Sequence, residues 1–246
     1  MAPRSPEPAD GDEPQRYFFV HVPKTAGTAL FVRLRHQFGY MAVYPTPEYE
    51  GHLDTSISVD LMVERFERHR DRIQVITGHF PLCAAERLGV PVSTFTVLRE
   101  PVERTLSFLR QQQRETPRFT GMSLEQIYDD DDFRWSLLTN YMVRQFSIEL
   151  REFRDGPQWF DEERIDMAKA NLEAMDVVGL QDDFEDFCRA LEARFGWDLG
   201  EPVRINQTTP EPVDPSFRER VAEDNFADVE LYRFAADLVR GRRQSS

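Results

Sequence analysis

The residues best suited to chemistry stand in a short loop near the start of the chain. The chain passes from the hydrophobic segment 17–20 into this loop and then into a segment with apolar residues at helical spacing. A loop between a strand and a helix brings backbone N–H groups together with the unpaired donors of the first helical turn, and such a loop binds phosphate or sulfate. The expected ligand-binding residues are Lys24, Thr25, Ala26, Gly27, Thr28 and Ala29. Only Lys24 and Lys169 among the 30 basic residues are lysines, and a compact ammonium differs chemically from a guanidinium in a crowded anion site.

A second anion-binding pattern follows another predicted strand. Residues 94–98 lead directly into Arg99, and Pro101 suits the first turn of a helix because it lacks the N–H that would have no partner there. Ser107 lies on that helix. Because Arg99 stands at the carboxyl end of a strand, both side chains can face a ligand in the crevice above a parallel sheet. The pair therefore predicts a second phosphate contact.

Together the two segments resemble the nucleotide-binding motifs of sulfotransferases that use 3′-phosphoadenosine 5′-phosphosulfate (PAPS), especially the carbohydrate type that includes the heparan and dermatan 2-O-sulfotransferases. The pattern P-K-T-A-G-T resembles the family's 5′-phosphosulfate loop, and R-x-P-x-x-R-x-x-S resembles its 3′-phosphate site. The resemblance implies that Lys24 stabilises the leaving phosphate, that Arg99 and Ser107 bind the 3′-phosphate, and that no metal is required.

Two details of these segments affect how the match is interpreted. Lys24 precedes the only glycine of its loop, whereas the nucleoside-triphosphate loop G-x-x-x-x-G-K-[ST] places lysine after the second glycine. The loop is therefore closer to the sulfotransferase pattern than to that of the triphosphate-binding proteins. Glu100 departs from the sulfotransferase family, which more often has Asp or Asn at this position.

Sulfuryl transfer to a hydroxyl needs a base, and the sequence offers three candidates. His79 follows the predicted strand 73–77 and a glycine, so we expect it at the carboxyl edge of the sheet. An imidazole is partly neutral near pH 7 and can accept the proton of the acceptor hydroxyl. Members of the 2-O-sulfotransferase group use a histidine in a comparable Gly-His context, so the resemblance assigns catalysis to His79. Glu48 or Glu50 is the alternative base. His21 lies in the strand before the loop, and we expect it to hold the backbone in place and not to act as the base.

Alternating apolar and amphipathic segments predict the elements that position these residues. They indicate an α/β fold with a mostly parallel central sheet flanked by helices, and the resemblance implies the P-loop-like fold of the sulfotransferases. The expected strands are 17–22, 73–77, 94–98 and 176–180. The expected helices are 26–38, 59–69, 82–88, 101–115, 123–129, 132–147, 161–174, 183–195, 215–223 and 226–240, with a loop near 41–55. The acidic run 129–132 is expected to cap the helix at 132–147.

Length and composition favour one enzyme-sized domain. The chain has 246 residues, of which 40% are hydrophobic, and we expect a single domain over residues 17–246. Residues 1–16 are rich in Pro, Asp and Glu and predict a disordered acidic tail. No segment approaches the roughly 18 apolar residues of a membrane span. Animal members of the family are usually anchored in the Golgi membrane, and this sequence shows no such anchor. We therefore expect a soluble, cytoplasmic, bacterial-type protein, with Cys83 and Cys188 as free thiols.

The net charge of −14 is unevenly distributed along the chain. Residues 17–118 contain 13 basic and 11 acidic residues, whereas residues 119–246 contain 15 basic and 29 acidic residues. The segment with both anion motifs therefore carries no excess of negative charge, as a site for a highly anionic donor requires. The overall charge argues against nucleic acid as a partner, and it favours a neutral or small acceptor over a long polyanion.

Later segments extend the resemblance to about residues 17–240. Residues 178–184 resemble the family's strand-turn-helix unit, and its C-terminal helix is matched by Asn225, Asp228, Leu231 and Tyr232. The segment 138–144 resembles an acceptor-side motif loosely and fits a core-packed helix equally well. A loop at 204–207 could close over the nucleotide.

The sequence thus predicts a sulfotransferase that moves a sulfuryl group from PAPS to a hydroxyl of a carbohydrate or another small metabolite. Two other classes stay open: a nucleotide-dependent kinase, which would prefer ATP with magnesium, and a catalytically silent nucleotide-binding protein. A sugar, a lipid glycan or a natural-product hydroxyl would each serve as the acceptor, and loops 40–58 and 111–160 are expected to shape its site.

Overall fold

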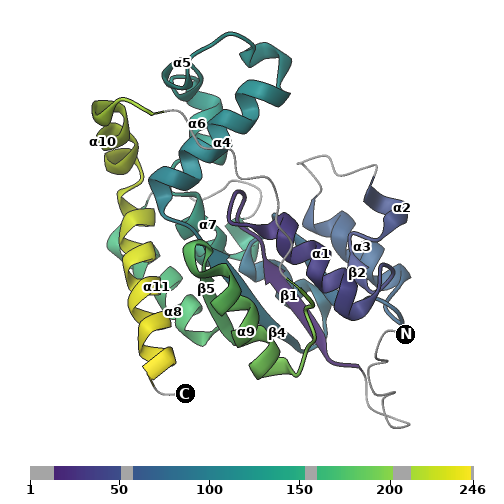
Figure 1. Ribbon diagram of the computed structural model, residues 1–246. Coiled ribbons are helices and arrows are strands. Elements are labelled where there is room, and N and C mark those ends of the chain that lie inside the picture. Colours follow the sequence, from purple (N-terminus) through teal and green to yellow (C-terminus); the bar gives the residue numbers. More distant parts are fainter. Residues whose placement is uncertain (1–13, 51–57, 153–159, 202–211, 245–246) are drawn as a thin grey trace.

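The computed structural model describes residues 14–50, 58–152, 160–201 and 212–244 (Figure 1). Its strands are β1 (Arg16–Val20), β2 (Val43–Tyr44), β3 (Val75–Gly78), β4 (Val92–Leu98) and β5 (Val177–Leu180). Its α-helices are α1 (Gly27–Phe38), α2 (Pro47–Glu50), α3 (Val59–Arg68), α4 (Pro101–Glu115), α5 (Leu124–Tyr128), α6 (Asp131–Leu137), α7 (Tyr141–Ser147), α8 (Glu162–Ala174), α9 (Phe184–Phe195), α10 (Pro215–Asp224) and α11 (Phe226–Gln244). Short 3₁₀ helices are η1 (Leu82–Leu88), η2 (Pro117–Phe119), η3 (Leu150–Glu152) and η4 (Gln181–Asp183).

The strands form one five-stranded sheet in the order β2-β3-β1-β4-β5, and every pairing is parallel. This confirms the predicted α/β fold with a parallel sheet flanked by helices. After β1, the chain forms β2 and β3 on one side of β1 in the strand order. It then crosses over and forms β4 and β5 on the other side of β1. The direction of winding therefore changes between β1 and β4, which is where open parallel sheets bind ligands at their carboxyl edge.

Alternating side chains of the central strand pack against two different helical layers. Tyr17 and Phe19 belong to a core with residues of α1 and α9, whereas Phe18 and Val20 belong to a core with residues of α3, α7, α8 and α11. Figure 1 shows α1 and α9 on the near face of the sheet. β1 is therefore buried on both faces, and the packing of its side chains fixes the position of the strand end.

A third core lies beyond the carboxyl edge of the sheet. It joins α4, α5, α6 and α10 through aromatic and aliphatic side chains such as Phe108, Phe133 and Phe217. In Figure 1, α4 extends from the end of β4 toward α5 and α6 at the top of the molecule. This arrangement places α4 beyond the carboxyl end of β4.

The predicted helix at 132–147 is wrong, because it is two helices that meet at Asn140. Asn140 has a left-handed backbone conformation (φ 47°), and its Oδ1 accepts from the N–H groups of Ala227 and Asp228 (3.1 and 3.2 Å). In return, the buried Asp228 carboxylate accepts from the N–H groups of Met142 and Val143 (3.0 and 2.8 Å). These bonds satisfy the free donors at two helix starts, and that gain outweighs the continuity of the apolar pattern.

The expected loop near 41–55 also contains regular structure. Val43 and Tyr44 form β2 beside β3, and α2 follows at Pro47. A two-residue strand is too short to show an alternating pattern in the sequence. The remaining expected strands and helices are confirmed to within a few residues; β1 begins at Arg16, the last residue assigned to the tail, while residues 1–13 lie outside the described part.

The acidic run does cap a helix, as predicted. Asp130 is the N-cap of α6 and accepts from the Phe133 N–H (3.0 Å), and Asp131 and Asp132 lie in the first turn. Carboxylates there favour the positive end of the helix dipole.

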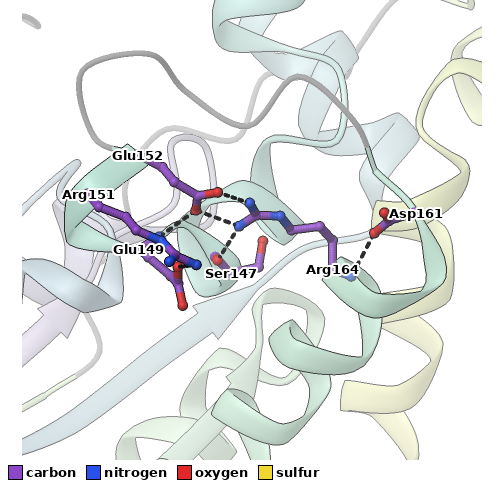
Figure 2. Close-up of polar contacts among 6 residues, drawn as sticks. All are labelled: Ser147, Glu149, Arg151, Glu152, Asp161 and Arg164. Atoms are coloured by element: carbon purple, nitrogen blue, oxygen red, sulfur yellow. Dashed lines mark hydrogen bonds and ion pairs between the residues drawn. The ribbon is translucent and has the colours of Figure 1, made fainter.

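A polar cluster ties η3 and the end of α7 to the start of α8 (Figure 2). Arg164 Nη1 donates to the Ser147 carbonyl (2.7 Å) and to Glu152 Oε2 (2.8 Å), while Arg164 Nη2 contacts Glu152 Oε1. Asp161 caps α8 by accepting from the Arg164 backbone N–H (3.0 Å). The hydrogen bonds from Arg164 lower the pKa of the Glu152 carboxyl. This two-pronged ion pair, together with the bond to Ser147, holds η3 and α7 against the start of α8.

Within the described residues, the structure contains no helix with the length and apolar run that a bilayer crossing requires.

Candidate functional site

The loop between β1 and α1 has the backbone shape of an anion site. Lys24 and Ala26 both have left-handed backbone conformations (φ 69° and 68°), which non-glycine residues seldom adopt. Among the described residues, the N–H groups of residues 25–28 have no hydrogen-bond partner, so up to four donors are available around this turn. Ala29 differs from the prediction, because its N–H already donates to the Ala26 carbonyl (3.0 Å). The loop is thus open to an anion at residues 25–28 and closed at Ala29.

Thr25 has a structural role in this turn. Its side chain is fully buried, and its hydroxyl donates to the Val22 carbonyl (2.8 Å). In the nucleoside-triphosphate loop, the hydroxyl after the lysine instead faces a magnesium ion. The burial of Thr25 therefore leaves its hydroxyl without access to such an ion.

Lys24 is a half-buried cation, and no hydrogen bond or ion pair reaches its ammonium from the described residues. Burial lowers the pKa of Lys24 from its ordinary value; the nearby Glu115 carboxylate opposes this effect, and the positive charges of Arg114 and Arg99 add to it. A cation that has lost part of its hydration without gaining a partner favours an incoming anion. The nearness of Arg114 and Glu115 could not be predicted from the sequence, because they stand at the far end of α4.

Arg99 lies directly beside this loop. Its Nη1 donates to the Lys24 backbone carbonyl at 3.2 Å, which brings the two predicted anion motifs together at the switch point between β1 and β4. Ser107 is half-buried on α4, and its hydroxyl has no partner among the described residues. Glu100 caps α4 by accepting from the N–H groups of Val102 and Glu103 (3.1 and 2.8 Å). Asp or Asn at this position would provide the same kind of cap, so the departure at Glu100 preserves the helix start.

His79 lies at the end of β3, on the other side of β1 from Arg99. Its Nδ1 is 2.9 Å from the His21 carbonyl oxygen, and because a carbonyl only accepts, Nδ1 carries the proton. In the neutral ring, Nε2 then has a free lone pair. Part of the ring is open to solvent, yet the protein atoms around it lower the pKa of His79, an effect that the bond to His21 opposes. This geometry suits a base.

The sequence did not predict the part that His21 takes in the site. Its ring centroid is 4.4 Å from that of His79, and it stacks on Phe19 at 5.1 Å with an interplanar angle of 12°. Burial lowers the pKa of His21 well below its ordinary value, and the positive charges of His79 and Lys24 lower it further. His21 is therefore neutral in the folded protein near pH 7.

The alternative base Glu48 is already engaged. Its Oε1 is 2.7 Å from His69 Nε2, and the Tyr49 hydroxyl lies 3.0 Å from the same nitrogen. Glu48 and Tyr49 belong to α2, which follows β2, and His69 stands at the end of α3. The side chain of Glu50 lies outside the described residues, as does the expected closing loop at 204–207.

The other family-like segments divide into structural and site-facing residues. Asn225 accepts from the Asn140 N–H (2.9 Å), and with Asp228 it fixes the start of α7, so the segment 138–144 has the packing role that was one of its two interpretations. Tyr232 differs, because it interacts electrostatically with Arg99 and Glu100. Burial raises the pKa of Tyr232 to about 12, with further contributions from acidic residues nearby. Tyr232 therefore lies near the residues that follow β4 and β5.

The fold and these residues define an α/β protein with a candidate anion-binding site at the carboxyl edge of its sheet. A scan against protein-family models matched no family, and a search of curated proteins found no match. The functional assignment therefore depends on the chemistry of the site itself.

Proposed function

We propose that this protein is a PAPS-dependent sulfotransferase that transfers a sulfuryl group to an acceptor hydroxyl of a carbohydrate or another small metabolite. The observation that carries the proposal is the hydrogen bond from Arg99 Nη1 to the Lys24 carbonyl. It joins two anion motifs that are 75 residues apart in sequence, at the strand ends where parallel sheets bind nucleotides. A nucleotide with phosphates on both its 3′ and 5′ positions matches two neighbouring cationic groups.

In this proposal the donor lies across the ends of β1 and β4. The N–H groups of residues 25–28 and the Lys24 ammonium bind the 5′-phosphosulfate, while Arg99 and Ser107 bind the 3′-phosphate. Tyr232 bounds the nucleotide on the β5 side. Because β3 lies on the opposite side of β1 from β4, the acceptor approaches over β3, where His79 is found.

The reaction is an in-line displacement. The acceptor oxygen forms a bond to sulfur as the bond between sulfur and the bridging phosphate oxygen breaks, and 3′-phosphoadenosine 5′-phosphate (PAP) leaves. His79 Nε2 takes the proton of the hydroxyl. Lys24 and the loop N–H groups stabilise the negative charge that develops on the leaving phosphate, so this chain's own residues supply the stabilisation that kinases obtain from magnesium.

The buried hydroxyl of Thr25 supports this choice over a kinase. A magnesium-dependent phosphoryl transfer uses the hydroxyl after the loop lysine as a metal contact, whereas Thr25 is fully buried and bonded to Val22. The proposal retains the cytoplasmic location expected from the sequence. It leaves the acceptor as any hydroxyl-bearing small molecule or glycan that reaches His79.

Calorimetric titration with PAP, and with ATP in the presence and absence of magnesium, tests the nucleotide specificity. We expect micromolar or tighter binding of PAP, at least tenfold weaker binding of ATP, and no requirement for magnesium. Lys24→Ala should abolish most of the PAP binding. Lys169→Ala is the matched control, because the other lysine pairs with Asp166 and Glu230 on α8 and α11. Tighter binding of ATP with magnesium than of PAP would overturn the proposal.

A further inference from the structure

The His21 ring has contacts on three sides at the point where β1 enters the anion loop. Phe19 stacks beneath it, with ring centroids 5.1 Å apart, and His79 lies beside it at 4.4 Å. The third neighbour is Gly27, the first residue of α1. The same imidazole therefore touches the predicted base and the predicted phosphate-binding turn.

The contact with Gly27 leaves no room for any side chain at that position. A Cβ atom on Gly27 would lie 1.8 Å from His21 Nε2, and the next ring atoms would be 2.3 and 2.4 Å away. Its backbone lies outside the left-handed region, so the missing Cβ serves close approach and not backbone freedom. The ring thus packs directly against the backbone that shapes the anion site.

The contact with His79 has a backbone part and a side-chain part. The His21 carbonyl accepts the His79 Nδ1 proton at 2.9 Å and so selects the tautomer with a free Nε2. The His21 ring lies against the His79 ring at an interplanar angle of 44° and so forms part of the surroundings of His79. The first effect survives any substitution at position 21, whereas the second depends on the side chain.

Two groups that can carry positive charge lie near the His21 ring. The charged groups that act on its ring are His79, from the end of β3, and Lys24, from the loop; Phe19 and Gly27 bring no charge. With both neighbours able to carry positive charge, an ionised His21 would be repelled from two sides. The ring therefore fills space without competing for the anion.

We propose that His21 is a positioning residue, whose ring couples the shape of the anion loop at Gly27 to the orientation and surroundings of His79. The inference rests on the proposed function, because it treats the loop as the donor site and His79 as the base. It assigns no proton transfer to His21 itself.

The first test asks whether Gly27 and His21 depend on each other. PAP binding is measured by calorimetry for the wild type, Gly27→Ala, His21→Ala and the double variant. We expect Gly27→Ala to weaken PAP binding at least tenfold, and the double variant to recover most of that loss because the new methyl group enters the space that the ring has left. Gly241→Ala is the control, since a Cβ there meets nothing within 4 Å. A double variant at least as weak as the combined single effects would overturn the inference.

The second test needs no nucleotide and therefore separates this inference from the proposed function. Nitrogen-15 NMR of the imidazoles should show His79 protonated on Nδ1 and His21 neutral well below pH 6.5. In His21→Ala, the pKa of His79 should rise toward its ordinary value because the ring loses a protein neighbour and gains contact with water, whereas His21→Phe should keep it low. An Nε2-protonated His79 in the wild type, or an unchanged His79 pKa in His21→Ala, would overturn the inference. Failure of wild-type PAP binding, with these NMR results intact, would count against the proposed function alone.

Discussion

Arg99→Ala should change the affinity for two nucleotides by different amounts. PAP and adenosine 5′-phosphate (AMP) differ only in the 3′-phosphate, which we assign to Arg99 and Ser107. The substitution removes the predicted 3′-phosphate contact and also the hydrogen bond to the Lys24 carbonyl. The two losses can be separated, because only PAP depends on the first and both ligands depend on the second.

The geometry sets the expected magnitudes. The bond to Lys24 is long, at 3.2 Å, so its loss should cost about 1 kcal/mol, or roughly fivefold in affinity for either ligand. Loss of a charge-assisted bond to a phosphate costs about 1.5–3 kcal/mol, or roughly 10- to 150-fold, and should affect PAP alone. Arg99→Ala should therefore bring the affinities for PAP and AMP close together.

The two losses are measured by calorimetric titration of PAP and of AMP into the wild type and into Arg99→Ala. Arg87→Ala is a suitable control, because that guanidinium pairs with the exposed Asp60 on α3. Equal losses for PAP and AMP would show that Arg99 acts only through the loop, and the assignment of the 3′-phosphate would be refuted.

Three other outcomes follow from the same geometry. Lys24→Ala should lower turnover in a sulfuryl-transfer assay at least about 100-fold and leave the melting temperature unchanged, since it removes a charge that stabilises the leaving phosphate. Near-normal turnover would contradict the role of Lys24. Because the surrounding protein lowers the pKa of His79, kcat/KM should stay constant near pH 7 and fall only as the pH drops through a value below about 6.5. His79→Ala should lose this fall in kcat/KM at low pH while it still binds PAP. An unchanged fall in the variant would exclude His79 as the base. Asn140→Ala should reduce the free energy of unfolding by about 2–4 kcal/mol in urea denaturation, because two buried N–H groups of α11 lose their acceptor, and a change below about 0.5 kcal/mol would contradict that account.

The sequence was sufficient for the elements with strong local signals. The start of α4 followed from Pro101 at its first position, and the adjacency of Lys24 and Arg99 followed from two loops that each end a parallel strand. The break at Asn140 could not be predicted, because bonds from α11, about 85 residues later, decide it. Long-range bonds of this kind leave no trace in the local pattern.

The site was likewise only partly predictable. His79 was placed correctly at a strand end, but the role of His21 depends on the neighbouring strand β3 and on the missing Cβ of Gly27. Ala29 was expected among the ligand-binding residues, yet its N–H donates to the Ala26 carbonyl. Which donors face a ligand is set by turn geometry that the residue types alone do not specify.

The most direct measurement for the central claim is a crystal structure of the protein with PAP. We predict one nucleotide across the ends of β1 and β4, with its 5′-phosphate within hydrogen-bond distance of Lys24 and residues 25–28 and its 3′-phosphate within reach of Arg99 and Ser107. A nucleotide that contacts only one of these two groups, or that binds elsewhere, would contradict the account.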